Sequence, residues 1–171
     1  SVTASGSASV RACKYVSVHV DRRMPGKPTI TGGVLIEVPV PATVQDWCDI
    51  YGVEIADVHV TLYKGVEADF ATDRSRADGI FYTPGTTVEP KRWDGGSAEC
   101  GDGLHLCPDP MLTHEFIGRP AHYLACRVAV ADIAVTAHPT YPTKVKARRV
   151  EVLYECDRDA KRIEATEGAL P

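Results

Sequence analysis

Apolar and polar residues alternate along much of this chain, a period of two that predicts β-strands. The clearest case is residues 57–66, where Val58, Val60 and Leu62 fall on one face and His59 and other polar side chains on the opposite face. Similar runs predict strands at residues 10–20, 33–40, 80–83, 104–107, 122–130, 132–136 and 144–156. We expect the first two of these to pair as a hairpin, and the last to be one long strand with a bulge near its start.

Two segments carry the local signals of a helix instead. Thr43-Val-Gln-Asp46 places a hydroxyl at an N-cap and an acid three residues later, which is a capping box, and Gly52 follows as a stop. Asp109 followed by Pro110 predicts the start of a second, short helix.

Many strands with about two short helices predict an α+β fold on a mostly antiparallel sheet or a split pair of sheets. The length of 171 residues suits a single domain. We therefore predict that residues 10–171 form this domain, while the small, polar residues 1–9 resemble an unfolded lead-in or a cloning remnant.

The formal net charge of −4 argues against general nucleic-acid binding, which needs a basic surplus or a basic face. The one basic cluster, residues 144–149, has lysines that alternate with apolar residues, so we predict a solvated strand face, with phosphate contact as the alternative. The sequence has no apolar run of about 18 residues and no signal-peptide pattern. We expect a cytoplasmic protein with no membrane segment.

The densest group of special residues is 99–116, which predicts a strand running from a glycine turn into a short helix. Cys100, His105, Cys107 and His114 in this segment are zinc-ligand types, but the six residues between the two cysteines do not match the usual knuckle spacing. Cys107 near a helix start could instead be a reactive thiol or, more simply, a small buried apolar residue. We expect no metal and reduced, mostly buried cysteines.

Two segments resemble the ADP-ribosyltransferase superfamily, especially its poly(ADP-ribose) polymerase-like branch. Residues 62–65 (L-Y-K-G) are similar to the L-W-H-G strand of that branch and to the Y-R-G of arginine-specific toxins. Residues 101–107 (G-D-G-L-H-L-C), the short helix and the strand at 122–130 are similar to its G-x-G-I-Y-F-A motif, serine-bearing helix and next strand. The resemblance implies an ADP-ribosyltransferase-like fold with NAD as the cofactor in a central cleft.

The same resemblance implies roles for particular residues. Lys64, with its neighbour Gly65, stands where that branch anchors the nicotinamide-side ribose, and His105 stands where a tyrosine stacks on nicotinamide. Tyr82 opens the loop that would close the cleft. Glu151, in the last strand, stands for the catalytic glutamate that stabilises the oxocarbenium-like ribose.

The chain is also similar, over residues 47–159, to an uncharacterised domain common in actinobacteria and their phages. Its G-[LF]-H-x-C-x-x-P centre corresponds to residues 103–108, and its Y-x-P-G-T-T segment to residues 82–87. No activity follows from that similarity. Two functions are therefore expected as alternatives: NAD-dependent ADP-ribosyl transfer, or a non-catalytic phage or mobile-element module that recognises a host protein or a nucleotide.

Overall fold

A computed structural model describes residues 7–20, 28–72, 79–98, 101–136 and 141–164. Within these residues the protein is mostly β, with several small sheets and only two short α-helices. The predicted ADP-ribosyltransferase-like α+β fold is therefore wrong. The physical reason is that no layer of helices covers the main sheet, and a second sheet contributes to the core instead.

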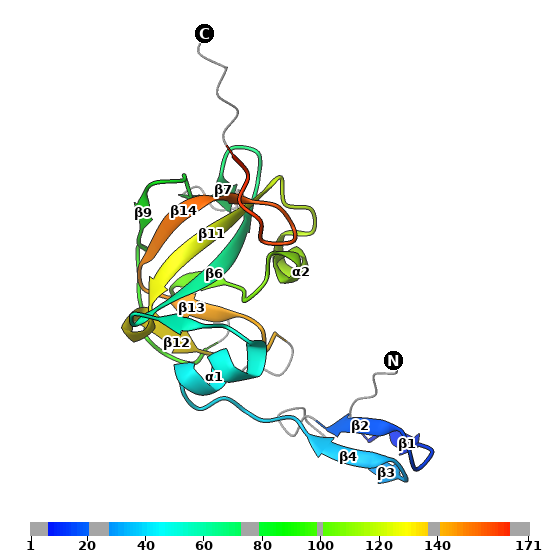
Figure 1. Cartoon of the computed structure of the whole chain (residues 1–171). Helices are drawn as coiled ribbons and strands as arrows, with labels where there is room; N and C mark the ends of the chain where they lie inside the picture. Colours follow the sequence, from blue (N-terminus) through cyan, green and yellow to red (C-terminus); the bar gives the residue numbers. More distant parts are fainter. Residues whose placement is uncertain (1–6, 21–27, 73–78, 99–100, 137–140, 165–171) are drawn as a thin grey trace.

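The main sheet has five strands, and every neighbouring pair is antiparallel. Its three long strands, β6, β11 and β14, lie side by side in Figure 1. A β-bulge interrupts the pairing of β11 with β14 between Ala125 and Cys126. In spatial order the strands are β5 (Ile55–Ala56), β6 (His59–Val66), β11 (His122–Ala129), β14 (Val150–Cys156) and β9 (Thr87–Val88).

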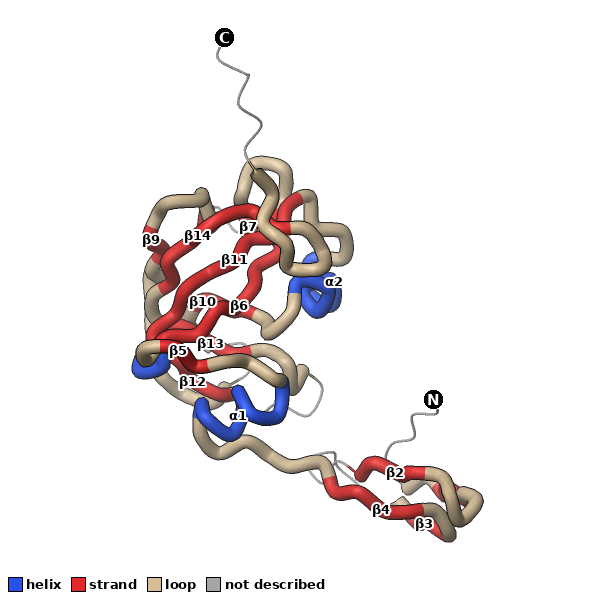
Figure 2. Tube along the Cα trace, viewed as in Figure 1, coloured by secondary structure: helices blue, strands red, loops and turns tan. Residues whose placement is uncertain are grey.

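A second, three-stranded antiparallel sheet has the order β10 (Leu104–Leu106), β13 (Val145–Ala147), β12 (Ile133–Val135). Figure 2 shows α1 (Val44–Tyr51) running beneath this sheet, next to β12. Trp47 of α1 is fully buried, and its indole Nε1–H donates to the carbonyl oxygen of Pro142. Apolar residues of both sheets and of α1 form one continuous core.

The predicted helix at Thr43 is confirmed. The Thr43 side chain accepts from the backbone N–H of Asp46, the Asp46 carboxylate accepts from the N–H of Thr43, and Gly52 ends the helix in the left-handed region at φ 66°. After the Asp109 cap comes a 3₁₀ turn, η1 (Pro110–Thr113), that leads into the four-residue α2 (His114–Ile117).

The predicted long strand at residues 144–156 is wrong in one respect, because the chain changes sheets within it. β13 belongs to the second sheet and β14 to the main sheet. The exposed Arg148 and Arg149 lie between them, and the N–H of Arg148 donates to the carbonyl of Asp132. The register shift read from the sequence is thus a crossing between two sheets.

The N-terminal strands do not form the predicted hairpin. β1 (Ser9–Arg11) pairs in parallel with β3 (Thr29–Thr31), and β2 (Ser17–Val20) pairs in parallel with β4 (Val34–Glu37). These two pairs lie apart from the two larger sheets in Figure 1. A turn also divides the run predicted as one strand at 10–20 into β1 and β2, so each half pairs with a different partner strand.

Three further elements complete the described chain. The short strands β7 (Ala71–Thr72) and β8 (Ile80–Phe81) pair with each other, and the 3₁₀ turn η2 (Val130–Asp132) joins β11 to β12. None of the helices in the described ranges has the length and apolar character needed to cross a membrane.

Candidate functional site

A cavity of about 680 Å³ opens beside β6 and β10, and we call it the central cavity. This volume lies in the range of sites for small ligands and cofactors. The connection from β9 to β10, the η1–α2 segment and Lys144 also contribute to its wall. The residues that line the cavity include Lys64, Gly65, Tyr82, Lys91, Arg92, Asp102, His105, Cys107, Phe116 and Lys144.

Lys64 lies at the inner wall of this cavity. It shares one face of β6 with the buried Val60 and Leu62, so the strand alternation directs it into the protein. Its Nζ donates a hydrogen bond of 2.8 Å to the carbonyl oxygen of His105 and lies 5.2 Å from the centre of the Tyr82 ring. Lys64, Tyr82 and His105, predicted to share a cleft, are therefore brought together.

His105 is positioned by the alternation of β10. Leu104 and Leu106 are buried on one face of this strand, which places the half-buried His105 on the other, toward the cavity. Tyr82 is 1 % exposed, and burial raises the pKa of its phenol, so it contributes an aromatic wall rather than a charge.

Gly65 also lines the cavity, and close packing explains why a glycine stands there. A Cβ at this position would lie 2.6 Å from Oγ1 of Thr113 and 3.0 Å from Cγ of Pro120. The η1 turn can therefore approach β6 closely only because residue 65 has no side chain.

Lys144 was predicted to lie on a solvated strand face together with Lys146, and this interpretation is wrong. Lys144 is 6 % exposed and Lys146 is fully buried. The Lys144 ammonium lies 4.9 Å from the centre of the Phe116 ring and 5.2 Å from that of Tyr141. These cation–π contacts compensate part of the cost of burying the charge at the cavity wall.

Among the described residues that line the central cavity, cationic side chains outnumber carboxylates. Lys64, Lys91, Arg92 and Lys144 line it, whereas Asp102 is the single carboxylate residue among the described residues that do so. Cationic side chains in a concave, partly apolar wall focus a positive potential there. The described wall of this cavity is therefore mostly cationic, in spite of the net negative charge of the chain.

Glu151 is not part of this cavity. It pairs across the sheet with Arg127, which in turn pairs with Thr61, and residues paired in this way point to the same face. Lys64 is three positions from Thr61 on the same strand and points to the other face. Arg127 Nε donates to Glu151 Oε2 at 2.8 Å, in a pair that is about half exposed.

The thiol at the central cavity, that of Cys107, does not favour nucleophilic chemistry. Cys107 lines the cavity but is 3 % exposed, and burial raises the pKa of its thiol to about 12. Its thiolate is therefore scarce near neutral pH. Across the described ranges, no three His, Cys, Asp or Glu side chains gather in a group that could hold a metal ion, and Cys100 of the proposed zinc set lies outside those ranges.

Sequence reasoning missed the ion pair between Lys146 and Asp94. Lys146 Nζ lies 2.6 Å from Asp94 Oδ1, and the same carboxylate accepts from the N–H groups of Gly96 and Asp102. The hydrogen bond from Lys146, followed by that from Gly96, holds the pKa of Asp94 below its usual value. The position of Lys146 between apolar residues of a strand was a signal that its side chain is buried. No local pattern, however, identified Asp94, 52 positions away, as its partner.

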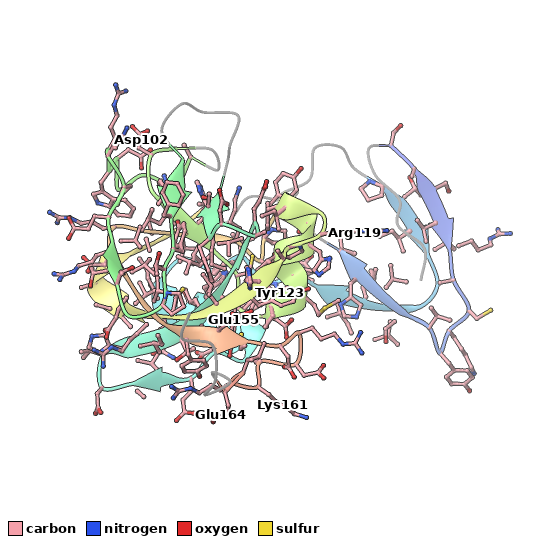
Figure 3. All side chains as sticks on the ribbon, turned by 90° about the horizontal axis from the view of Figure 1, so that it is seen from above. Asp102, Arg119, Tyr123, Glu155, Lys161 and Glu164 are labelled. Atoms are coloured by element: carbon pink, nitrogen blue, oxygen red, sulfur yellow. The ribbon has the colours of Figure 1, made fainter. Side chains whose placement is uncertain are left out.

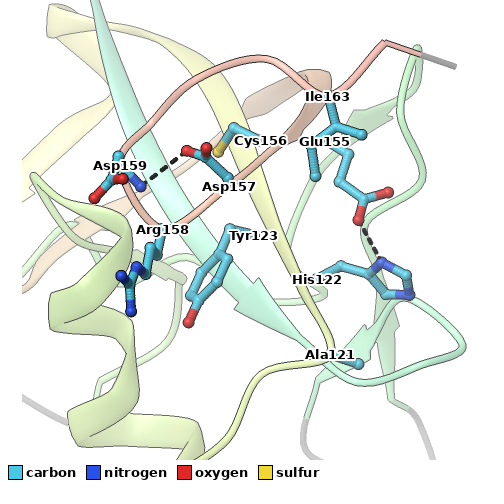
Figure 4. Close-up of a pocket in the computed structure, with 9 residues that line it drawn as sticks. All are labelled: Ala121, His122, Tyr123, Glu155, Cys156, Asp157, Arg158, Asp159 and Ile163. Carbon is cyan, nitrogen blue, oxygen red and sulfur yellow. Dashed lines mark hydrogen bonds and ion pairs between the residues drawn. The ribbon is translucent and has the colours of Figure 1, made fainter.

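A second, smaller cavity of about 410 Å³ lies at the end of β14 (Figure 4). His122 Nδ1 lies 2.7 Å from Glu155 Oε1, and the His122 ring stacks on Phe70. Figure 3 places Glu155 and Asp102, at the rims of the two cavities, well apart. The Asp157 carboxylate accepts from the backbone N–H groups of Asp159 and Lys161, and Arg158 and Asp159 also line this cavity, so its wall carries charges of both signs.

The fold and the site together define a mostly β protein with a cation-lined central cavity. A family model described as "Domain of unknown function (DUF7666)" matches residues 60–162, which include most of the two larger sheets and the cavity-lining residues from Lys64 to Lys144. The chain belongs to this family. Neither the curated proteins nor the solved structures contain a match.

Proposed function

We propose that the central cavity binds an anionic nucleotide and that the protein is a binding module. The observation that supports this most is the one-sided set of Lys64, Lys91, Arg92 and Lys144 around a cavity of nucleotide size. Phosphate groups are the natural partners of such cations. The aromatic walls formed by Tyr82 and Phe116 suit a planar base or a sugar.

Calorimetric titration of the purified chain with ADP, and with adenosine as the uncharged control, tests this proposal. ADP should bind, adenosine should bind at least about tenfold more weakly, and raising the salt concentration should weaken ADP binding, because much of the affinity is electrostatic. Equal affinity for the two compounds, or no binding of either, contradicts the proposal.

A second candidate is NAD-dependent ADP-ribosyl transfer, and one observation favours it. The four residues assigned to NAD by resemblance, Lys64, Gly65, Tyr82 and His105, all line one cavity. Against it, Glu151 points to the opposite face of the main sheet, so the cavity lacks the carboxylate assigned to catalysis.

Release of nicotinamide from NAD separates the two candidates. A binding module should give no release above a buffer control. Under the transferase hypothesis, Glu151→Gln should lower the rate by roughly 10²-fold, as removal of a preorganised electrostatic group does. Turnover by the wild type that Glu151→Gln abolishes would favour the transferase over the binding module.

A further inference from the structure

The connection between β9 and β10 contributes a basic wall to the central cavity that is separate in sequence from Lys64 and Lys144. Lys91 and Arg92 lie on it, directly before Trp93 and Asp94. We call residues 91–92 the basic wall. Both residues are exposed to solvent.

The position of this wall depends on Asp94. Its carboxylate is bound by the fully buried Lys146 ammonium at 2.6 Å, and it accepts from the N–H groups of Gly96 at 2.9 Å and Asp102 at 3.0 Å. One side chain thus ties together two parts of the β9–β10 connection and fastens both to the centre of the second sheet. We call Asp94 and Lys146 the clamp.

The glycines around the clamp show how closely it is packed. A Cβ at Gly101 would lie 2.1 Å from Asp94 Oδ2 and 2.5 Å from Lys146 Nζ, and a Cβ at Gly103 would lie 3.0 Å from the Trp93 ring. The backbone at Gly101 therefore packs directly against the ion pair. Since Arg92 is two residues from Asp94, the clamp restricts where the basic wall can lie.

The number of positive charges bears on the ligand. A phosphate monoester carries about −1.5 to −2 at neutral pH, which two cations already balance. Lys64 and Lys144 could provide that balance, and Lys91 and Arg92 then provide two further positive charges from a different segment. Such a distribution suits a ligand with a second anionic group.

We propose that the basic wall, held by the Asp94–Lys146 clamp, recognises a second phosphate, so that the cavity prefers nucleoside diphosphates and longer polyphosphates to monophosphates. This inference rests on the proposed function. Asp94 and Lys146 act as positioning residues in it, because they reach the ligand only through the wall that they hold.

The test compares AMP, ADP and inorganic pyrophosphate by calorimetric titration of the full chain. The wild type should bind ADP at least about tenfold more tightly than AMP. In Lys91→Gln/Arg92→Gln the affinity for ADP should fall at least about tenfold more than the affinity for AMP, so that the preference for ADP is lost. The matched control, Arg158→Gln/Lys161→Gln, removes two positive charges away from the central cavity and should preserve the preference.

Asp94→Asn/Lys146→Met tests the clamp without leaving a buried charge unpaired. It should abolish the preference for ADP over AMP, whereas a merely structural pair would lower stability and leave that ratio unchanged. If AMP and ADP bind equally to the wild type, or if the basic-wall variant keeps the preference, the inference is overturned and the proposed function stands. If no nucleotide binds, both are overturned, and binding of pyrophosphate alone would restrict the site to phosphate groups.

Discussion

Lys64 and His105 are 41 positions apart in the chain and are joined by a hydrogen bond of 2.8 Å from Nζ to the carbonyl oxygen. This bond connects β6 of the main sheet to β10 of the second sheet beside the central cavity. Lys64 therefore serves two purposes in our interpretation, since it fastens the sheets and presents a positive charge to the ligand.

Lys64→Met keeps the length of the side chain and removes its charge. We expect the affinity for ADP to fall about tenfold or more, since hydrogen bonds to charged groups are worth about 1.5–3 kcal/mol. Loss of the bond to His105 should also lower the free energy of unfolding by about 1 kcal/mol. Calorimetric titration and urea denaturation measure the two effects.

Lys161→Met is the matched control for this substitution, because Lys161 is exposed and does not line the central cavity. It should leave both the affinity and the stability nearly unchanged. If Lys64→Met reduces stability but binds ADP like the wild type, Lys64 has only the structural role.

Gly65→Ala should destabilise the protein by about 1–3 kcal/mol, as overpacking at a close contact does. The added Cβ would collide with Thr113, on the η1 turn that packs against β6. Gly96→Ala is the control, since a Cβ at that position would come no closer than 3.8 Å to any atom outside its chain neighbours. Urea denaturation measures the stability of both variants. Equal denaturation midpoints for Gly65→Ala and Gly96→Ala would contradict the prediction and show that η1 can move away from β6 without cost.

The thiols should differ sharply in reactivity. Cys13 is exposed, whereas Cys48, Cys107, Cys126 and Cys156 are buried. Burial raises the pKa of Cys107 and Cys126 to about 12, so both the exposure and the thiolate fraction oppose reaction.

The measurement uses a Cys13→Ser/Cys100→Ser variant, which leaves the four buried thiols. A disulfide reagent at pH 8 should label these four only on unfolding, at a rate that rises with added urea. Rapid labelling of one of them in the native protein would show that its surroundings open without global unfolding.

The parts of the fold that follow from short-range signals could be predicted from the sequence. The helix at α1 is an example, because Thr43, Asp46 and Gly52 supply its start and stop within ten residues. The strands β6 and β11 are also confirmed, since their alternation is long and regular. In each case the deciding interactions lie within the element itself.

The parts that depend on distant partners could not be predicted in this way. The run at 144–156 has the alternation of a single strand, yet its first part, β13, belongs to the second sheet and its last part, β14, belongs to the main sheet. Lysine side chains usually lie at the protein surface, but that of Lys146 is fully buried. Its burial is possible because the carboxylate of Asp94 compensates its charge. For the site, the joint location of Lys64, Tyr82 and His105 was predicted through a family resemblance, although the fold implied by that resemblance is wrong.

The Asp94–Lys146 pair should give the stability of the protein a specific dependence on pH. Hydrogen bonds from Lys146 and Gly96 lower the pKa of Asp94 in the folded protein from its usual 3.8. A carboxyl whose pKa is lowered by folding stabilises the folded state above its unfolded pKa, and that contribution is lost as the pH falls through the folded value. The wild type should therefore exceed Asp94→Asn in stability at pH 6, with a gap that narrows below about pH 3.8. Urea denaturation between pH 6 and pH 2 measures the gap, and a gap that stays constant over this range would show that the Asp94 charge does not stabilise the fold.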